Sequence, residues 1–525
     1  MISYTSFSFF VIFFGITFVL YSISPKIIKW CVLLIGSYAF YFISARGHII
    51  SIVLTSLIIW AIGLALNYLD TRQREKRKLA EKEEKKLIKA RYNRYKCAAM
   101  SVGVISALSL LLITKYSNFF IDTVNTVFSA EFNNVSIIQP LGISFFSLQA
   151  VSYIVDVYYG RTEAEKNPLK VSLYLSFMLT VVEGPIARYG ELAPQLYEGK
   201  QNNIEDISKG FLRVLWGLFK KTVIADRAVI LVNSVFDNYE NFSGIGTAAG
   251  IAFYTLQLYC EFSGVMDVMC GLGNMLGIKL PENFSRPFFA KTINEFWQRW
   301  HISLGTWLRD YIFYPVSFSK GIKSISNKTR QKLSPYYGKL IPTATALFFV
   351  WFSNGFWHGS SWKYIVYGLY YYILMMTGQF LEPVFERICK ALRINRKSKP
   401  YVAFQILRTV ATVNIGMLIF RADSLKTALY MFKSMFTEID LSVLTVGHKN
   451  GFNLGLCDYG AIVIGFVMLV VVGVLQEKGI DIKDKFYKLP YFVKVLLFLV
   501  LLFVIIVFGA YGEGYGVVDL IYANF

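Results

Sequence analysis

The sequence predicts an all-helical protein that crosses a membrane many times, and three observations support this fold class. Hydrophobic residues make up 55% of the 525 residues, charged residues only 17%, and the mean hydropathy is +0.47, whereas soluble domains carry roughly 25% charged residues. Apolar runs of about 20 residues, the length that spans a bilayer as a helix, recur along the chain. Lys and Arg outnumber Asp and Glu by 54 to 34. In a membrane protein this excess marks loops retained in the cytoplasm, so nucleic-acid binding is not expected.

Candidate membrane helices follow one another along the whole chain. They are 4–23, 28–45, 48–68, 97–114, 138–159, 169–187, 209–235, 246–278, 340–357, 362–382, 401–421, 459–475 and 490–511. Two are poor spans: 209–235 holds charged residues throughout, among them Arg213, Lys220, Lys221, Asp226 and Arg227, and 246–278 holds Glu261 and Asp267. Charges at membrane depth require a protein-lined or watery setting. We therefore expect about ten or eleven crossings, with re-entrant or interfacial helices besides.

The charged segment 70–96 sets the expected orientation. It carries twelve Lys or Arg and five Asp or Glu, a mixture typical of a solvated helical extension. The positive-inside rule places this segment in the cytoplasm. An alternative role is docking of an acidic partner or anionic lipid. The first span lacks a basic leader and is too long for a signal peptide, and no Pro/Gly/Ser-rich linker interrupts the chain. One membrane domain over 1–525 is expected.

The cysteines predict neither a disulfide framework nor a metal site. No two of them form a CxxC pair, and most lie within or beside apolar segments, so they are interpreted as small buried hydrophobes. They are Cys31, Cys97, Cys260, Cys270, Cys389 and Cys457.

Histidine is scarce, and two of the four histidines lie in tryptophan-rich polar patches. His301 lies in EFWQRWHISLGTWLRDYIFYP (295–315) and His358 in WFSNGFWHGSSW (351–362). Six of the nine tryptophans fall in these patches: Trp297, Trp300, Trp307, Trp351, Trp357 and Trp362. An interfacial tryptophan belt explains some of them, but not the presence of both histidines. The other two histidines have no such setting and are interpreted as structural: His48 and His448.

The first patch predicts a helix over 295–310. Trp297 and His301 would then share one stripe, and Trp300 and Ser303 would line the next.

The charges of the same patch indicate where this helix lies. Glu295 and Arg299 are four residues apart and are expected to pair. Together with Arg309 and Asp310 they make the segment too charged to face lipid, so it should be re-entrant or line a cavity. Each ionisable group in the other apolar segments is either part of a functional site or paired with a group on another helix. These groups are Asp156, Glu183, Arg188, Lys220, Lys221, Asp226, Arg227, Glu261, Asp267 and Arg421.

His358 is expected at a helix end or turn. It follows the apolar run 343–352 and precedes Gly359 and two serines. An imidazole titrates near neutral pH and can act as a general base. The alternative is a histidine hydrogen-bonded for packing.

At these two patches the sequence resembles the membrane-bound O-acyltransferase family, in particular its bacterial branch of alginate O-acetylase membrane subunits. The pair FWQRWHISLGTWLRDY and WHGSSW is specific to it. The resemblance covers about residue 138 to the end, with a looser match before. The matching stretches are PLGISFFSLQAVSYIVDVYYGR (140–161), EGPIARY (183–189), GLFKKTVIADR (217–227), LQLYCEFSGVMDVMCGLGNMLGIKLPENFSRPF (256–288), INEFWQRWHISLGTWLRDYIFYPV (293–316), FWHGSSW (356–362), FRADS (420–424) and LIYANF (520–525).

The resemblance implies a fold of many helices around a tunnel through the membrane, with N-terminal helices over 1–137 and a core over 138–525. It implies transfer of an acyl group from a thioester to a hydroxyl. His358 matches the near-invariant histidine of the family, and His301 the second histidine of the bacterial branch. That branch acetylates extracytoplasmic polysaccharide from the bacterial cytoplasmic membrane. It works beside a hydrolase-like acetyltransferase, and its expected donor is acetyl-CoA.

These implications assign expected roles to individual residues. His358 would be the general base. His301 would orient the donor, donate to the oxyanion or partner the base, and Asn354 would donate a hydrogen bond. Trp357, Trp300 and Ser303 would support the site. No cofactor is expected to stay bound. Four basic residues would attract the phosphates of coenzyme A or of a carrier's phosphopantetheine: Arg299, Arg309, Lys220 and Lys221. Alternatively, they only snorkel to the membrane surface or set the membrane topology.

Two departures and three rival readings remain. The helix after the second patch, YIVYGLYYYIL (364–374), lacks a histidine that many relatives have there, so its role is missing or taken by a tyrosine. Glu261 replaces the usual aspartate. The nearest rival function is D-alanyl transfer to teichoic acid from a carrier protein. A glycan transporter or flippase, and a scaffold with structural histidines, are rivals from other classes.

Overall fold

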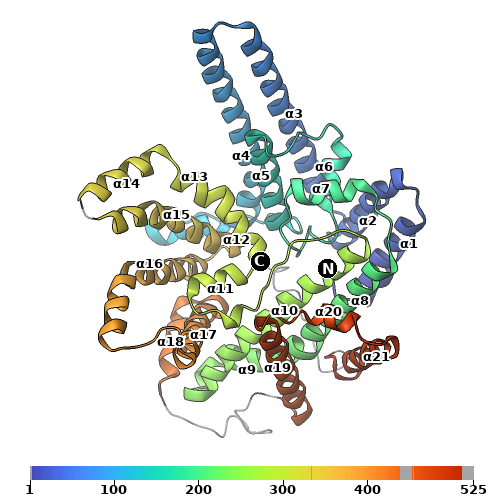
Figure 1. Ribbon diagram of the computed structural model, residues 1–525, viewed down its shortest axis with the longest axis vertical. Helices are drawn as coiled ribbons and strands as arrows, with labels where there is room; N and C mark the ends of the chain where they lie inside the picture. Colours follow the sequence, from blue (N-terminus) through green and yellow to red (C-terminus); the bar gives the residue numbers. More distant parts are fainter. Residues whose placement is uncertain (1–2, 333, 438–451, 453, 511–525) are drawn as a thin grey trace. The chain divides into compact units, whose positions relative to one another are not determined.

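The structure is a computed structural model that describes residues 3–332, 334–437, 452 and 454–510 (Figure 1). These residues form helices joined by turns and loops, with one isolated antiparallel bridge between Phe284 and Trp300. The predicted all-helical class is thereby confirmed. The chain ending at 520–525 and His448 lie outside the described residues.

The chain divides into two compact units. Among the described residues, one comprises 3–214 and Met269–Pro281, and the other comprises Leu215–Val268 and those from Glu282 to 510. These units do not test the predicted division at residue 137 or the predicted single membrane domain, and both stay predictions.

The first unit is built mainly from the N-terminal helices. Polar contacts in it join residues that are distant in sequence: the Tyr4 hydroxyl donates to the Met178 carbonyl at 2.7 Å. The helices are a π-helical turn Phe9–Gly15, α1 (Ile16–Ile23), α2 (Lys29–Ser44), α3 (Ile50–Leu79), α4 (Lys82–Phe128), α5 (Ile143–Tyr159), α6 (Pro168–Ser176), α7 (Tyr189–Glu198) and the first part of α8 (Ile204–Leu218).

Helices α3 and α4 run side by side and carry the basic segment 70–96 (Figure 1). At 1.5 Å per residue they are about 45 and 70 Å long, well beyond the ~30 Å hydrocarbon core. Their charged ends are mostly exposed, and Lys96 bonds Asp70 at 2.8 Å across the pair. The predicted helical extension is confirmed; its cytoplasmic location stays a prediction.

The second unit holds both tryptophan-rich patches. Its core is rich in aromatic side chains from helices that are distant in sequence. The helices are a π-helical segment Phe219–Ala225, α9 (Asp226–Asp237), most of α10 (Gly244–Met275), α11 (Ile293–Arg299), α12 (Ile302–Leu308), a π-helical turn Arg309–Phe313, α13 (Tyr314–Ser317), α14 (Lys320–Lys332), α15 (Pro335–His358), α16 (Trp362–Ala391), α17 (Lys399–Arg421), α18 (Leu425–Ser434), α19 (Leu456–Glu477), α20 (Ile482–Tyr487) and α21 (Tyr491–Phe508).

Among the described residues, seven helices are long and apolar enough to cross a membrane. They are Lys26–Ser44, α3, α4, α15, α17, α19 and α21. The sequence predicts ten or eleven crossings, and the difference has structural causes. The predicted span 169–187 ends as a helix at Ser176, and 209–235 is interrupted by the π-helical segment.

The prediction that the cysteines are buried holds for only some of them. Cys260, Cys270 and Cys389 are buried, whereas Cys97 and Cys457 are exposed, because they lie on outward-facing positions of α4 and α19. None of these six cysteines, all of them among the described residues, forms a disulfide bond.

Candidate active site

The first patch is broken at His301 rather than forming one helix. Helix α11 ends at Arg299, Trp300 is extended (φ −113°, ψ 130°), and His301 is left-handed (φ 48°, ψ 52°) before α12 begins. The predicted helix over 295–310 is therefore wrong, and so is the stripe that paired Trp297 with His301. A left-handed non-glycine residue costs about 1–2 kcal/mol, so the surroundings must hold this conformation.

A short loop segment provides that support. The Ser285 N–H donates to the Arg299 carbonyl at 2.9 Å, and the Ile302 N–H donates to the Asn283 carbonyl at 3.0 Å. These bonds flank the isolated bridge between Phe284 and Trp300. The backbone on both sides of His301 is thereby pinned to residues 283–285.

The His301 side chain is buried between an amide and two aromatic rings. Its Nδ1 lies 3.3 Å from Asn283 Oδ1, and its ring meets Phe262 edge to face at 4.8 Å between centroids. The Trp357 ring lies 6.0 Å away. His301 lies outside the seven candidate spans, and burial lowers its pKa to about 3. The ring is thus neutral at physiological pH.

His358 is the last residue of α15, and this confirms the predicted helix end. The residue is 4% exposed. Aromatic rings surround it edge to face: Phe420 at 5.3 Å, Tyr367 at 6.0 Å and Trp357 at 5.0 Å between centroids. Tyr367 belongs to the helix that lacks the additional histidine, so a tyrosine of that helix contacts His358.

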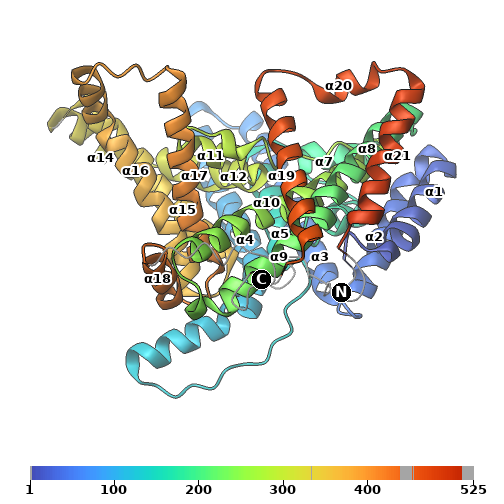
Figure 2. The same ribbon diagram turned by 90° about the horizontal axis from the view of Figure 1, so that it is seen from below.

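Trp357 connects the two patches, because both imidazole rings lie against it. A second contact joins Trp297 to Trp351 at 4.9 Å, and both of these rings pack on Tyr371. Both figures show α11 and α12 in the same part of the second unit as α15 (Figures 1 and 2). The fold therefore brings His301 and His358 into one aromatic cluster.

The remaining supporting candidates take different positions. Asn354 is 5% exposed, and its Oδ1 accepts no hydrogen bond from any described residue. The Ser303 N–H donates to Asn283 Oδ1 at 3.0 Å, which links Ser303 to the residue that holds His301. Trp300 stacks on Phe296 at 5.4 Å in the aromatic core. The role of each in catalysis stays a prediction.

Lys220 and Lys221 lie in the π-helical segment and face carboxylates. Lys220 bonds Asp267 at 2.7 Å, and Lys221 bonds Asp226 at 2.6 Å and Glu261 at 3.3 Å. Both lysines are buried. These ion pairs account for the burial without a bound phosphate, so donor binding by these lysines stays a prediction.

The two arginines proposed to bind the donor differ in exposure. Arg299 pairs with Glu295 at 2.7 Å, as predicted, and with Glu477 at 2.6 Å. Arg309 is half exposed and pairs with its neighbour Asp310 at 2.9 Å. Of the four basic candidates, Arg309 is the most accessible to a ligand.

Other charges within apolar segments are also paired. Asp156 bonds Arg161 at 3.1 Å in the first unit, and Arg421 bonds Asp237 at 3.4 Å in the second. Arg227 pairs closely with Asp458. Pairing between helices is confirmed for Arg421 and Arg227, whereas Asp156 pairs with a residue just after its own helix. Within the described residues, no group of three or more His, Cys, Asp or Glu could hold a metal ion.

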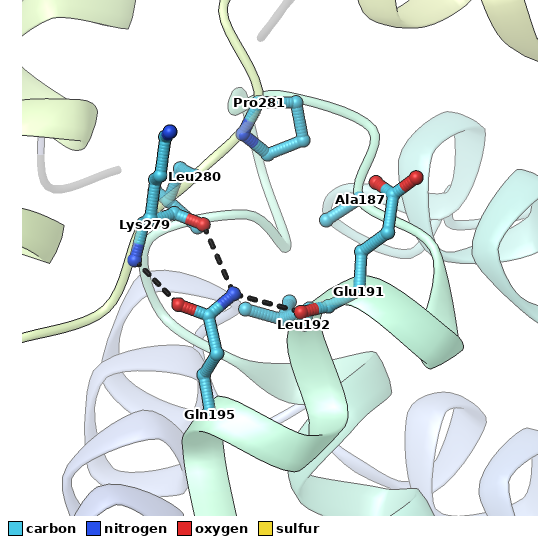
Figure 3. A pocket seen from close by; sticks show the side chains of 7 residues that line it. All are labelled: Ala187, Glu191, Leu192, Gln195, Lys279, Leu280 and Pro281. Carbon is cyan, nitrogen blue, oxygen red and sulfur yellow. Dashed lines mark hydrogen bonds between the residues drawn. The ribbon is translucent and has the colours of Figure 1, made fainter. Parts of the chain in front are cut away.

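A surface pocket lies within the first unit (Figure 3). It has a volume of about 360 Å³, and Gln195 crosses its floor, accepting from the Lys279 N–H at 2.8 Å and donating to the Glu191 carbonyl at 2.7 Å. None of the predicted site residues lines it: the walls are Ala187, Glu191, Leu192, Gln195, Lys279, Leu280 and Pro281. The pocket is not the candidate active site.

Sequence reasoning missed four residues that contact the histidines: Asn283, Phe262, Tyr367 and Phe420. Each lies in a stretch that resembles the family or in the helix after the second patch, but their contacts depend on tertiary structure. Asn283 begins an Asn-x-Ser triplet, a pattern that is expected by chance in a chain of this length. It is only 1% exposed.

Known proteins share these patches. The model of the membrane-bound O-acyltransferase family matches residues 164–331. Proteins named probable alginate O-acetylase, from Pseudomonas aeruginosa and Azotobacter vinelandii, are each 31% identical to this chain. The alignments cover 71% and 72% of this chain and 66% and 70% of theirs. This chain belongs to the membrane-bound O-acyltransferase family.

Further relatives of this O-acyltransferase carry different substrate names. The peptidoglycan O-acetyltransferase of Helicobacter pylori is 31% identical over 65% of each chain. The teichoic acid D-alanyltransferase of Bacillus subtilis is 29% identical over 47% of this chain and 60% of its own. The names of these relatives share transfer of an acyl group and differ in the acyl group and the acceptor. Because the alignments span about two thirds of the relatives or less, donor and acceptor are taken up as proposals.

Proposed function

We propose that this protein moves an acetyl group from a cytoplasmic thioester, acetyl-CoA, to a hydroxyl of an extracytoplasmic polysaccharide. Transfer goes directly or through a hydrolase-like partner acetyltransferase, and the protein works in the bacterial cytoplasmic membrane. The observation that carries the proposal is the contact of both His301 and His358 with Trp357 in one buried cluster. The names of the alginate and peptidoglycan relatives support acetate as the acyl group.

The chemistry requires no strong nucleophile, because a thioester carbonyl is already activated. His358 takes the proton of the attacking hydroxyl while the hydroxyl oxygen bonds to the carbonyl carbon of the thioester. The carbon–sulfur bond then breaks, and the departing thiolate takes up the proton from the imidazolium. General base action contributes about 10²–10⁴-fold, and fixing the two reactants in attack geometry contributes more.

The surroundings of His358 suit this role. The aromatic rings around the imidazole keep His358 buried, which limits the loss of the transferred proton to solvent. Asn354 lies one helical turn before His358, with an amide that can bond a substrate. Arg309 is the most accessible of the basic residues that would attract the donor's phosphates.

D-alanyl transfer from a carrier protein is the second candidate, and the teichoic acid relative favours it. One paired measurement separates the two. Mild base releases ester-linked acetate and D-alanine from the envelope glycans of cells that carry wild type or His358→Ala. Loss of acetate alone supports the proposal. Loss of D-alanine alone selects the second candidate, and loss of neither contradicts both.

A further inference from the structure

Asn283 is buried in the loop between α10 and α11 and contacts the His301 ring. Its Oδ1 lies 3.3 Å from His301 Nδ1 and 3.0 Å from the Ser303 backbone nitrogen. Its Nδ2 lies 2.9 Å from the Met266 sulfur. Every polar atom of this amide therefore faces a defined neighbour.

The Ser303 contact fixes which way the amide points. A backbone N–H can only donate a hydrogen bond, so the atom that faces it must be the amide oxygen. The NH₂ end then faces the Met266 thioether, which is a weak acceptor and no donor. The orientation is thus set by two independent partners.

The amide orientation in turn fixes the proton on His301. An amide oxygen accepts and never donates, so the imidazole nitrogen that faces it must carry hydrogen. We propose that Asn283 is a positioning residue that holds His301 in the tautomer with hydrogen on Nδ1 and a lone pair on Nε2. The inference rests on the proposed function for its catalytic meaning, but the tautomer itself does not depend on it.

This assignment narrows the role of His301. With its hydrogen on Nδ1, the neutral ring offers Nε2 as an acceptor, so Nε2 can take a proton or receive a hydroxyl's hydrogen bond. It cannot donate to an oxyanion from that nitrogen. Of the three roles expected from the sequence, donation to the oxyanion is the one this tautomer excludes at Nε2. The backbone supports the same arrangement, because the Asn283 carbonyl accepts from Ile302 beside the left-handed His301.

A direct test reads the tautomer itself. The chain has four histidines, so solid-state NMR of the full-length protein with ¹⁵N-labelled histidine, in lipid, gives few signals. His301→Gln identifies those of His301. The expected spectrum has a protonated Nδ1 and an unprotonated Nε2 for His301, and Asn283→Leu should shift intensity toward the opposite tautomer. A protonated Nε2 in the wild type, or no change in Asn283→Leu, overturns the proposal.

A second test asks whether the positioning matters for turnover. Asn283→Leu removes the acceptor and should lower O-acyl ester formation per folded protein about 10–100-fold, the size of effect seen when a group that orients a metal-binding histidine is lost. Asn283→Asp keeps the oxygen and should retain more activity, with the acidic limb of its pH profile moved upward, because a carboxylate favours the imidazolium. Asn414→Leu is the matched control: it removes another asparagine that bonds a side chain, Thr255, and should leave the pH profile unchanged.

The outcomes distinguish this inference from the proposed function. Equal losses in Asn283→Leu and Asn283→Asp, with an unmoved pH profile, mean that Asn283 is only structural and contradict the positioning role. Full activity of His358→Ala contradicts the proposed function, whereas the NMR result still decides the tautomer.

Discussion

Two polar clusters in the second unit bury their groups among different neighbours. In the π-helical segment, Lys220 and Lys221 face carboxylates at 2.6–3.3 Å. In the aromatic cluster, His301 and His358 face rings and an amide. Both clusters lie at irregular backbone: a π-helical segment, which is frequent at functional sites, and a left-handed residue between two helices.

The two clusters differ in what their buried polar groups can do: the lysines stabilise the fold, and the histidines can take part in a reaction. A buried lysine requires a counter-charge, because an unpaired buried charge is very costly. An imidazole can be buried as a neutral ring and still accept a proton. Pairing is therefore enough to explain the lysines, whereas the histidines retain a group that can do chemistry. Variants in each cluster should have different consequences.

The largest expected effect is on turnover, in the aromatic cluster. His358→Ala should lower O-acyl ester formation by at least about 100-fold, because it removes the general base. Quantifying base-released esters from cells with equal amounts of inserted protein checks this. His48→Ala, at an exposed histidine, is the control and should behave as wild type. Near-normal esters in His358→Ala would remove His358 from the mechanism.

The next effect is on stability, in the lysine cluster. Lys221→Met leaves the buried Glu261 and the partly buried Asp226 without their cation, and breaking a buried pair costs about 3–5 kcal/mol. Thermal unfolding in lipid nanodiscs should show a clear drop in midpoint, and Lys221→Met combined with Glu261→Gln should recover part of it. An unchanged midpoint for Lys221→Met would show that the pair is not needed for folding.

The smallest stability effect is expected at Arg309. Its half-exposed pair with Asp310 is worth about 0–1 kcal/mol after solvent screening, so Arg309→Ala should unfold within a few degrees of wild type. If Arg309 attracts the donor's phosphates, the KM for acetyl-CoA should rise and the rise should shrink at high salt. A KM that stays at the wild-type value excludes Arg309 from donor binding.

The sequence predicts the fold class and the two patches because these depend on composition and local residue types. Apolar length identifies most spanning helices, the Glu295–Arg299 spacing predicts their ion pair, and the run of Trp, Gly and Ser around His358 predicts a helix end. Helix periodicity, by contrast, predicts a continuous helix over 295–310.

The interruption at His301 could not be predicted, because its cause is tertiary. It depends on backbone hydrogen bonds from residues 283–285, which follow a different helix. The same contacts make Asn283 important, and no local pattern marks it. Spans such as 209–235 fail as simple helices for a related reason: their lysines are satisfied by carboxylates on α10, which only the folded structure brings within reach.

We infer that the buried histidines perform acyl transfer while the buried lysines stabilise the fold. The most direct measurement compares specific activity per folded protein in His358→Ala and Lys221→Met, purified in the same lipid and supplied with acetyl-CoA and envelope glycan. We expect His358→Ala to be inactive with near wild-type stability, and Lys221→Met to be active but less stable. An active His358→Ala beside an inactive, fully stable Lys221→Met would contradict it.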